Sequence, residues 1–314
     1  PVNKLDSGVS VVIPCFKSAQ TIVPLVNRLH DVLDGTDYEI ILVVDGSPDD
    51  TWQHVQKLAA HDRVRGLNLM RNYGQHNALL AGILDARKAV VVTMDDDLQH
   101  LPEEIPQLLK ALTGDVDLVY GVAESEEHGF WRSLASRTVK SAMAIVLGVD
   151  YARNISAFRA FRAELVEPLR NLTDAFVSID VCLSWATTRV VSVPVTMERR
   201  AAGASSYSVR SLMAHAFNMV TGYSDRPLKM VTALGLASAF LGLILFVYVL
   251  ALFFTGTTEV PGFTTIAAMV AMFSGAQMLA LGITGQYIGR LHFRSMSRPT
   301  YVIRQRVGDD STHD

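Results

Sequence analysis

Three consecutive aspartates, Asp95, Asp96 and Asp97, are the residues of this chain best suited to chemistry. They follow the apolar run 89–93, whose β-branched residues are typical of a buried parallel strand. Adjacent carboxylates repel one another, and a hard divalent cation is the usual compensation. Alternation along an extended segment predicts Asp95 and Asp97 on one side and Asp96 on the other. The alternative is a strand end that leads into a helix whose first turn accepts acids.

The segments around this motif predict a doubly wound α/β sheet. Apolar strands are expected at residues 9–14, 39–44, 64–69, 89–93, 117–121 and 190–197. Amphipathic helices are expected at residues 21–33, 52–60, 77–86 and 102–112. Alternating strands and helices indicate parallel pairing, with a ligand crevice at the carboxyl edge of the sheet. Asp45 ends the second strand, and Asp50 or Thr51 is expected to cap the helix that follows.

Composition and missing motifs exclude several classes of protein. The 314 residues carry a formal net charge of only −3, which does not indicate a nucleic-acid binder. The sequence holds no Gly-rich phosphate loop, which argues against ATPases and dehydrogenases. Cys15 and Cys182 each lie in an apolar segment, so we expect reduced, buried thiols and a catalytic half in the cytoplasm. No apolar leader precedes the first strand, so no signal peptide is predicted.

Four ordered motifs resemble a known family. They read VVIPCF, VVDGSPDDT, LMRNYGQHNALLAG and MDDDLQH. In this order and spacing they resemble the family 2 glycosyltransferases of GT-A fold. The resemblance is closer to the polyprenyl-phosphate glycosyltransferases, a group that includes dolichol-phosphate mannose synthase and bacterial undecaprenyl-phosphate sugar transferases. The resemblance extends over residues 9–306. The tripeptide GQH at residues 74–76 is similar to the formamido-arabinose transferase branch of the group.

The resemblance implies a reaction and its site residues. The reaction is inverting transfer of a sugar from a nucleotide-diphosphate donor, a UDP-sugar rather than a GDP-sugar, to undecaprenyl or decaprenyl phosphate for cell-envelope glycans. The residues implied to contact the donor are Pro14, Asp45, Asp96, Gln99 and Arg200. Those implied to bind Mg²⁺ or Mn²⁺ are Asp95, Asp97 and Gln99, of which the two aspartates are catalytic. Those implied to meet the acceptor phosphate are Arg132, Arg137 and Ser156.

The chain departs from the family pattern in places. Gln75 and Ser206 stand where relatives often carry lysine, and Ala157 replaces a glycine. An aspartate proposed as a base in some relatives is missing from residues 154–162. A phosphate monoester with a second pKa near ~6 is already mostly dianionic at neutral pH, so the acceptor needs no base. The alternative for the arginines in residues 130–137 and 199–200 is that they lie on a solvated surface and bind no phosphate.

The C-terminal third predicts a membrane anchor. An amphipathic interfacial helix is expected at 209–223, followed by two spans at 230–254 and 263–288. Basic residues flank the pair of spans, but the link between the spans has none, which places both chain ends in the cytoplasm. The predicted division is a GT-A domain at 1–208, an interfacial helix at 209–227, a transmembrane hairpin at 228–289 and a tail at 290–314. The expected location is the plasma (inner) membrane.

Two other functions stay open at this point. A processive polysaccharide synthase shares the domain but needs more spans and a Gln-x-x-Arg-Trp motif, which the chain lacks. A membrane-anchored sugar-nucleotide binding or scaffold protein, a partner of a flippase, would carry a broken metal motif, whereas Asp95, Asp97 and Gln99 are all present. Family likeness further implies a homo-oligomer, a tetramer. No nucleic-acid partner is expected.

Overall fold

The computed structural model describes residues 8–60, 63–123, 155–170, 178–198, 226–255, 262–296 and 299–308. The chain divides into two compact units. The first, which we call the sheet unit, comprises Pro1–Leu212 and Ser297–Asp314. The second, the helical unit, comprises Met213–Met296. Several predicted features lie outside the described residues. They are Arg132, Arg137, Arg200, Ser206, the interfacial helix and most of the link between the two spans.

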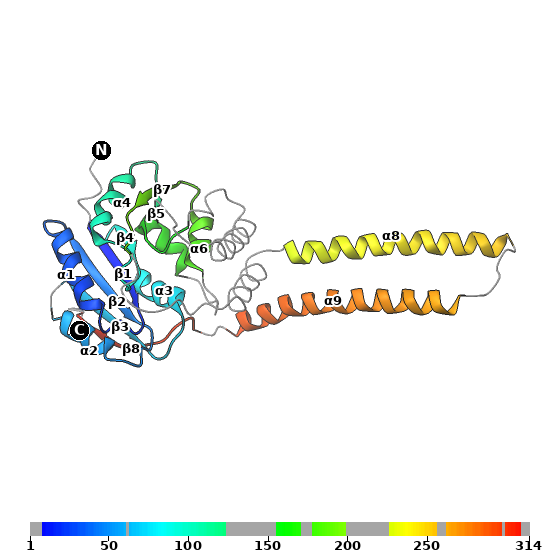
Figure 1. Cartoon of the computed structure of the whole chain (residues 1–314), viewed down its shortest axis with the longest axis horizontal. Helices are drawn as coiled ribbons and strands as arrows, with labels where there is room; N and C mark the ends of the chain where they lie inside the picture. The colour runs from blue at the N-terminus through cyan, green and yellow to red at the C-terminus, as the bar shows by residue number, and fades with distance from the viewer. Residues whose placement is uncertain are drawn as a thin grey trace. The chain divides into compact units, whose positions relative to one another are not determined.

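The sheet unit is built on one mixed β-sheet (Figure 1). Its strands are β1 (Val9–Cys15), β2 (Tyr38–Val44), β3 (Val64–Leu69), β4 (Val90–Thr93), β5 (Leu118–Ala123), β6 (Arg159–Arg162), β7 (Val190–Val195) and β8 (Ile303–Val307). Their order in the sheet is β7-β5-β6-β4-β1-β2-β3-β8. The central strands β4, β1, β2 and β3 pair in parallel, whereas β6 and β8 run antiparallel to their neighbours. The carboxyl ends of the central strands therefore share one edge.

Helices cover both faces of this sheet because its central strands are apolar on both sides. The helical segments are α1 (Ile22–Leu33), α2 (Thr51–Leu58), α3 (Gln75–Asp85), η2 (Pro102–Glu104), α4 (Ile105–Ala111), η4 (Ala163–Leu169) and α6 (Ile179–Ala186). Val11 and Ile13 of β1 pack into a core with α1, α2 and α4. Val12, between them, packs into a second core with α3, η4 and α6. The predicted α/β class is confirmed.

Long-range pairing accounts for what the sequence patterns missed. The strands predicted before residue 122 are present with small shifts at their ends, and Cys15 and Cys182 are buried and form no disulfide with each other. Strand β6 was not predicted, because its short run of alternating arginine and apolar residues gives no strong strand signal. It is placed by hydrogen bonding between β4 and β5, with Val91 opposite Phe161 and Val119 opposite Ala160.

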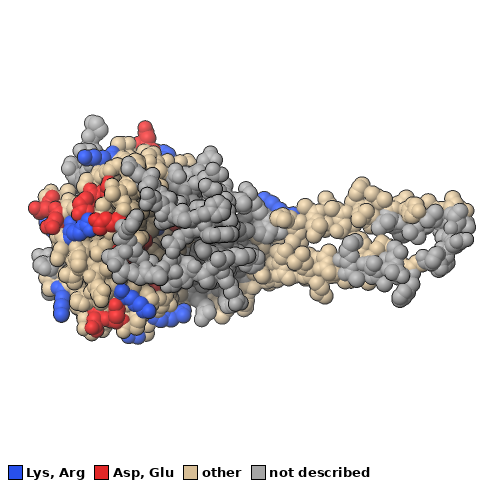
Figure 2. Space-filling view, viewed as in Figure 1, with Lys and Arg blue, Asp and Glu red and all other residues tan. Residues whose placement is uncertain are grey.

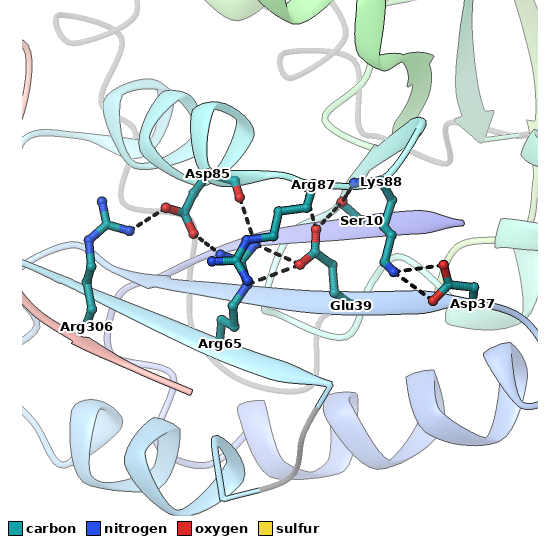
Figure 3. Close-up of polar contacts among 8 residues, drawn as sticks. All are labelled: Ser10, Asp37, Glu39, Arg65, Asp85, Arg87, Lys88 and Arg306. Atoms are coloured by element: carbon teal, nitrogen blue, oxygen red, sulfur yellow. Dashed lines mark hydrogen bonds and ion pairs between the residues drawn. The ribbon is translucent and has the colours of Figure 1, made fainter. Parts of the chain in front are cut away.

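Buried ion pairs hold the amino edge of the sheet, opposite the shared carboxyl ends (Figure 3). Glu39 of β2 is 7% exposed and accepts hydrogen bonds from the Arg65 guanidinium at 2.7 and 3.1 Å. Its other oxygen accepts from the Ser10 hydroxyl at 2.6 Å and the Arg87 amide at 2.7 Å. Arg65 also pairs with Asp85 at 2.5 Å. Each buried charge at this edge thus has a counter-charge, as burial requires.

The helical unit contains α8 (Arg226–Phe254) and α9 (Phe263–Ser295). Both predicted spans are therefore helical. Among the described residues, no helix has the length and apolarity needed to cross a membrane, so the two spans are not confirmed. In the view of Figure 2, charged side chains are spread over the sheet unit, and those drawn on the helical unit gather at one end.

Candidate active site

The carboxyl edge of the sheet brings three strand-end segments together, two of which carry acids. Strand β1 lies between β2 and β4, with Cys15 opposite Val44 and Val12 opposite Thr93. The Asp45 amide also donates to the Cys15 carbonyl at 3.0 Å. The residues that follow these strands, at 16–18, 45–47 and 94–97, therefore meet at one place. This is the crevice that the strand-helix alternation predicted.

The side chain of Asp45, which follows β2, is held by the turn between β3 and α3. Its side chain accepts the Tyr73 amide at 2.7 Å and the Gly74 amide at 2.8 Å, and the residue is 3% exposed. Burial raises the pKa of Asp45, although the two amides and the Arg71 charge act against this. Gly74 has a φ of 93°, which favours glycine at this position. The carboxylate is held by backbone donors, which favour its charged form against the effect of burial.

Asp96 closes the loop that follows β1. One of its oxygens accepts from the Ser18 hydroxyl and from the Phe16 amide, the latter at 3.2 Å. Burial raises the pKa of Asp96 to about 6, and the neighbouring Asp95 and Asp97 add to the rise. The Ser18 and Phe16 hydrogen bonds oppose it. Asp96 therefore ties the β1–α1 loop to the aspartate motif.

Asp95 and Asp97 accept hydrogen bonds from different segments of the chain. The Gln75 side-chain amide donates to Asp95 at 2.6 Å, whereas Asp97 accepts the Gln99 amide at 3.1 Å. The predicted alternation is wrong because β4 ends at Thr93, so the motif is not extended. A turn follows at once, with Leu98 at a φ of 63°. Asp96 and Asp97, rather than Asp95 and Asp97, line a common cleft.

This cleft has a volume of about 560 Å³. It is lined mainly by polar residues of the β1–α1 and β2–α2 segments together with the aspartate motif. These are Phe16, Lys17, Ser18, Ala19, Gln20, Thr21, Asp49, Asp50, His54, Asp96 and Asp97. Its size suits a nucleotide-sized ligand. Pro14, a predicted donor contact, is buried inside β1, and the residues just after it form the wall.

A polar seam joins the two loops that line the cleft. The Lys17 amide donates to the Ser47 hydroxyl at 2.8 Å, and the Ser18 amide donates to Thr51 Oγ1 at 2.9 Å. Asp49 accepts from Ser47 at 2.5 Å and from the Thr51 hydroxyl at 2.6 Å. The Thr51 amide donates to Asp49 at 3.3 Å. Asp50 occupies the predicted N-cap position of α2 but makes no capping hydrogen bond with its side chain, and Asp49 bonds to the first turn instead.

The sequence interpretation missed a buried polar cluster beneath the motif. Arg159 is 1% exposed, donates to Thr93 Oγ1 at 2.9 Å and forms an ion pair with Asp180. The Tyr120 hydroxyl donates to the same Asp180 oxygen at 3.1 Å. The only sequence signal was an arginine and an aspartate in otherwise apolar segments. Arg159 is thus a structural partner of α6, although it lies in the segment whose Ser156 was predicted to meet the acceptor.

His100 supports the motif from its far end. Its Nδ1 accepts the Asp95 amide at 3.2 Å, and its ring stacks on Phe158 with centroids 5.2 Å apart. Burial lowers the pKa of His100 to about 4, so the imidazole is neutral and can accept this bond. A β-bridge joins His100 to Met197, and the Glu198 amide donates to the Gln99 carbonyl at 3.0 Å. The segment before the predicted donor loop is thereby attached to the motif.

The described residues contain no group of three His, Cys, Asp or Glu side chains arranged to hold a metal ion. The predicted ligands are two carboxylates and the amide of Gln99, so they are not a group of three such side chains. Ser156 accepts the Phe158 amide at 3.2 Å. The roles of these residues stay predictions.

Comparison with known proteins decides the family. The model of glycosyl transferase family 2 matches residues 10–170, which include every segment of the cleft. The chain belongs to glycosyl transferase family 2. It is 33% identical over 305 residues to the undecaprenyl-phosphate 4-deoxy-4-formamido-L-arabinose transferase of Pseudomonas paraeruginosa (strain DSM 24068 / PA7), which covers 95% of this chain and 90% of that protein. The transferase of the same name from Enterobacter sp. (strain 638) is 31% identical, covering 96% and 94%.

Solved structures agree on the fold of this glycosyltransferase. A crystal structure of a mycobacterial protein superposes with a TM-score of 0.52 at 23% identity and covers 70% of this chain and 74% of that one. Glucosyl-3-phosphoglycerate synthase from Mycobacterium tuberculosis, in complex with phosphoglyceric acid, gives 0.50 at 22% identity and covers 70% and 79%. The predicted resemblance to polyprenyl-phosphate glycosyltransferases is confirmed, and with it the assignment of the chain as an enzyme.

Proposed function

We propose that this glycosyltransferase transfers a sugar from a UDP-sugar to a polyprenyl phosphate, with inversion at the anomeric carbon. The observation that carries the proposal is the match to undecaprenyl-phosphate transferases over 95% of the chain, which includes the C-terminal helices as well as the cleft. A soluble acceptor would not require sequence similarity to extend through α8 and α9. The 4-deoxy-4-formamido-L-arabinose class is the first sugar to test.

The donor is proposed to bind along the carboxyl edge. Asp45 can accept a hydrogen bond from an N–H group of the nucleotide base or from a ribose hydroxyl. Its carboxylate is buried, and two backbone amides set its orientation. The nucleotide-sized cleft is bounded by Phe16 and Asp96, and Asp45 is joined to the start of this wall by the hydrogen bond from its amide to the Cys15 carbonyl. Asp96 holds the β1–α1 loop, which forms a wall of the cleft. It therefore contributes to donor binding by keeping that wall in position.

A divalent cation is proposed to complete the site. The predicted ligands Asp95, Asp97 and Gln99 supply oxygen donors, the kind that Mg²⁺ and Mn²⁺ prefer. Such ions are commonly held by one or two carboxylates plus substrate phosphates, so a group of three acidic side chains is not required. When bound, the cation supplies charge neutralisation to the leaving nucleoside diphosphate. His100 and Gln75 hold the Asp95 amide and carboxylate.

The chemical step needs little from a base. An oxygen of the acceptor phosphate forms the new bond to the anomeric carbon while the bond from that carbon to the nucleoside diphosphate breaks. The acceptor phosphate is mostly dianionic at neutral pH, so no proton has to leave it. The residues proposed to hold phosphates are Arg132, Arg137, Ser156 and Arg200, because arginine's planar fork suits phosphate oxygens.

Membrane attachment is proposed from the sequence. Residues 230–254 form an uncharged run of about 25 residues, the length that crosses a ~30 Å hydrocarbon core. Basic residues before this run and after 288 place the sheet unit on the cytoplasmic side of the inner membrane. An anchored enzyme meets a lipid acceptor by diffusion in two dimensions. The tetrameric state stays a prediction.

A transfer assay on the detergent-purified full chain tests the proposal. Wild type and Asp97→Asn are each incubated with undecaprenyl phosphate, Mg²⁺ or Mn²⁺, and a panel of UDP- and GDP-sugars. The lipid products are identified by mass spectrometry. We expect one UDP-sugar to give a lipid-phosphate sugar, and the variant to lose at least a hundredfold in rate because a metal ligand is removed. Asp31→Asn, an exposed aspartate of α1, is the matched control and should react like wild type.

Two outcomes would contradict parts of this proposal. Normal turnover by Asp97→Asn at saturating Mg²⁺ would remove the metal role of that residue. Nucleotide binding without any product, from every donor tested, would favour a sugar-nucleotide binding protein that partners a flippase.

A further inference from the structure

We propose that the C-terminal strand β8 is a positioning element of the donor site: it holds the β3–α3 turn that orients Asp45. The inference rests on the proposed function for the identity of the donor, but its structural part stands on the contacts of β8 alone. Strand β8 follows the helical unit in the sequence and returns to the sheet unit. Nothing in the family motifs requires this segment to take part in the site.

Strand β8 is docked closely along β3. Leu67 pairs with Arg306 and Asn68 with Gln305 in antiparallel register. Just past the strand, Gly308 has a φ of 73°, and a Cβ at that position would lie 2.2 Å from the Val64 carbonyl oxygen. Only glycine allows the two backbones to approach this far. The close fit indicates that the segment after α9 has one defined position on β3.

The pairing continues beyond β3 into the turn that holds Asp45. The Met70 amide donates to the Val302 carbonyl at 2.9 Å, so the first residue of the turn is bound to the C-terminal segment. The next residue, Arg71, packs against Gly46, where a Cβ would lie 2.3 Å from the Arg71 carbonyl carbon. Three and four residues after Met70 come the two amides that bind Asp45. A backbone path of direct contacts therefore connects β8 to the carboxylate.

A second contact acts at the other end of α3. Arg306 of β8 pairs with Asp85, the last residue of α3, and Arg65 of β3 pairs with the other oxygen of the same carboxylate (Figure 3). At its first residue, the same helix presents Gln75 to Asp95 at 2.6 Å. The turn between β3 and α3 is thus bounded by Met70 and by a helix whose far end is fixed to β8. Release of β8 would loosen both boundaries together.

Hydrogen exchange and donor binding on the detergent-purified full chain test this proposal. Arg306→Ala removes the contact to Asp85, and Gly308→Ala removes the close approach to Val64. We expect amide exchange in residues 70–79 to speed up at least tenfold in both variants. We expect the KM for the donor, and the Kd for UDP, to rise three- to tenfold while kcat stays within twofold. Arg306→Lys keeps a cation for Asp85 and should recover most of the donor affinity.

Controls separate positioning from a general loss of stability. Arg170→Ala removes an exposed ion pair to Glu167 in the same unit and should change neither exchange at 70–79 nor donor affinity. Faster exchange confined to 301–308, with the turn and donor affinity unchanged, would overturn the proposal. Equal acceleration throughout α1 would overturn it as well, because β8 would then only stabilise the unit. If wild type binds neither UDP nor GDP, the proposed function fails, and the exchange result still decides the coupling.

Discussion

The acids that follow β2 and β4 are held differently from the acids at the amino edge of the sheet. At the amino edge, Glu39 and Asp85 pair with the Arg65 guanidinium (Figure 3). Asp117, at the same edge, pairs with Arg189 at 2.9 Å. At the carboxyl edge, the acid of β2 accepts backbone amides, and the middle aspartate of the motif accepts an amide and a hydroxyl. Arginine partners neutralise a buried carboxylate, whereas amides and hydroxyls orient it and leave its charge.

This difference separates residues that stabilise the fold from residues available for binding. Burial alone would raise the pKa of Asp117, but hydrogen bonds from Thr187 and Arg189 outweigh it and hold the pKa below the usual range. The pKa values of Asp45 and Asp96 are raised, because burial outweighs their hydrogen bonds. A cation brought by a ligand, or bound with it, would lower the electrostatic cost at the carboxyl edge. The amino edge has no such need.

The largest effect on stability is expected for Glu39→Gln. The change leaves the Arg65 charge buried with one carboxylate fewer, which costs about 3–5 kcal/mol of free energy of unfolding. Urea denaturation followed by tryptophan fluorescence measures it. Donor affinity of the folded protein should not change, since Glu39 lies at the edge away from the cleft. The double variant Glu39→Met with Arg65→Met should lose less than Glu39→Gln; a larger loss would contradict the role of charge pairing.

At the carboxyl edge, Asp45→Asn should affect binding more than stability. Asparagine can accept only one of the Tyr73 and Gly74 amides and lacks the charge, so we expect the Kd for UDP to rise about ten- to hundredfold. The free energy of unfolding should change by less than about 2 kcal/mol, because the neutral side chain avoids the desolvation cost. Isothermal titration calorimetry and urea denaturation give the two quantities. Unchanged UDP affinity would rule out this residue as a donor contact.

The smallest effect is expected for Asp117→Asn, and it depends on pH. The folded-state pKa of Asp117 is lowered, so its stabilisation is present above the unfolded value near ~4 and is lost as pH falls through the folded value. We expect a loss of roughly 1–2 kcal/mol at pH 7, discounted because Arg189 is 59% exposed. Denaturation at pH 7 and pH 3 should show the difference from wild type shrinking at pH 3. A constant difference would show that charge is not its source.

Much of this architecture follows from local sequence patterns. Hydrophobic runs of strand length and amphipathic stripes of helix length depend on neighbouring residues, so β1 to β4 and α1 to α3 were predicted close to their observed bounds. The acids at strand ends were recognised for the same reason. The order of parallel strands then requires Asp45 and the aspartate motif to meet at one edge.

Other features depend on contacts between residues far apart in the chain. Which aspartate faces the cleft depends on where β4 ends and on the turn at Leu98, and Arg159 is buried only because α6 supplies Asp180. Strand β8 reaches β3 from the far end of the sequence, beyond a whole helical unit. Periodicity carries no information on such pairings, since it reports which face of a segment is apolar and not what covers that face. The sequence by itself determined the elements and the chemistry at their ends; only tertiary pairing decided which side chains are oriented for binding and which are neutralised for stability.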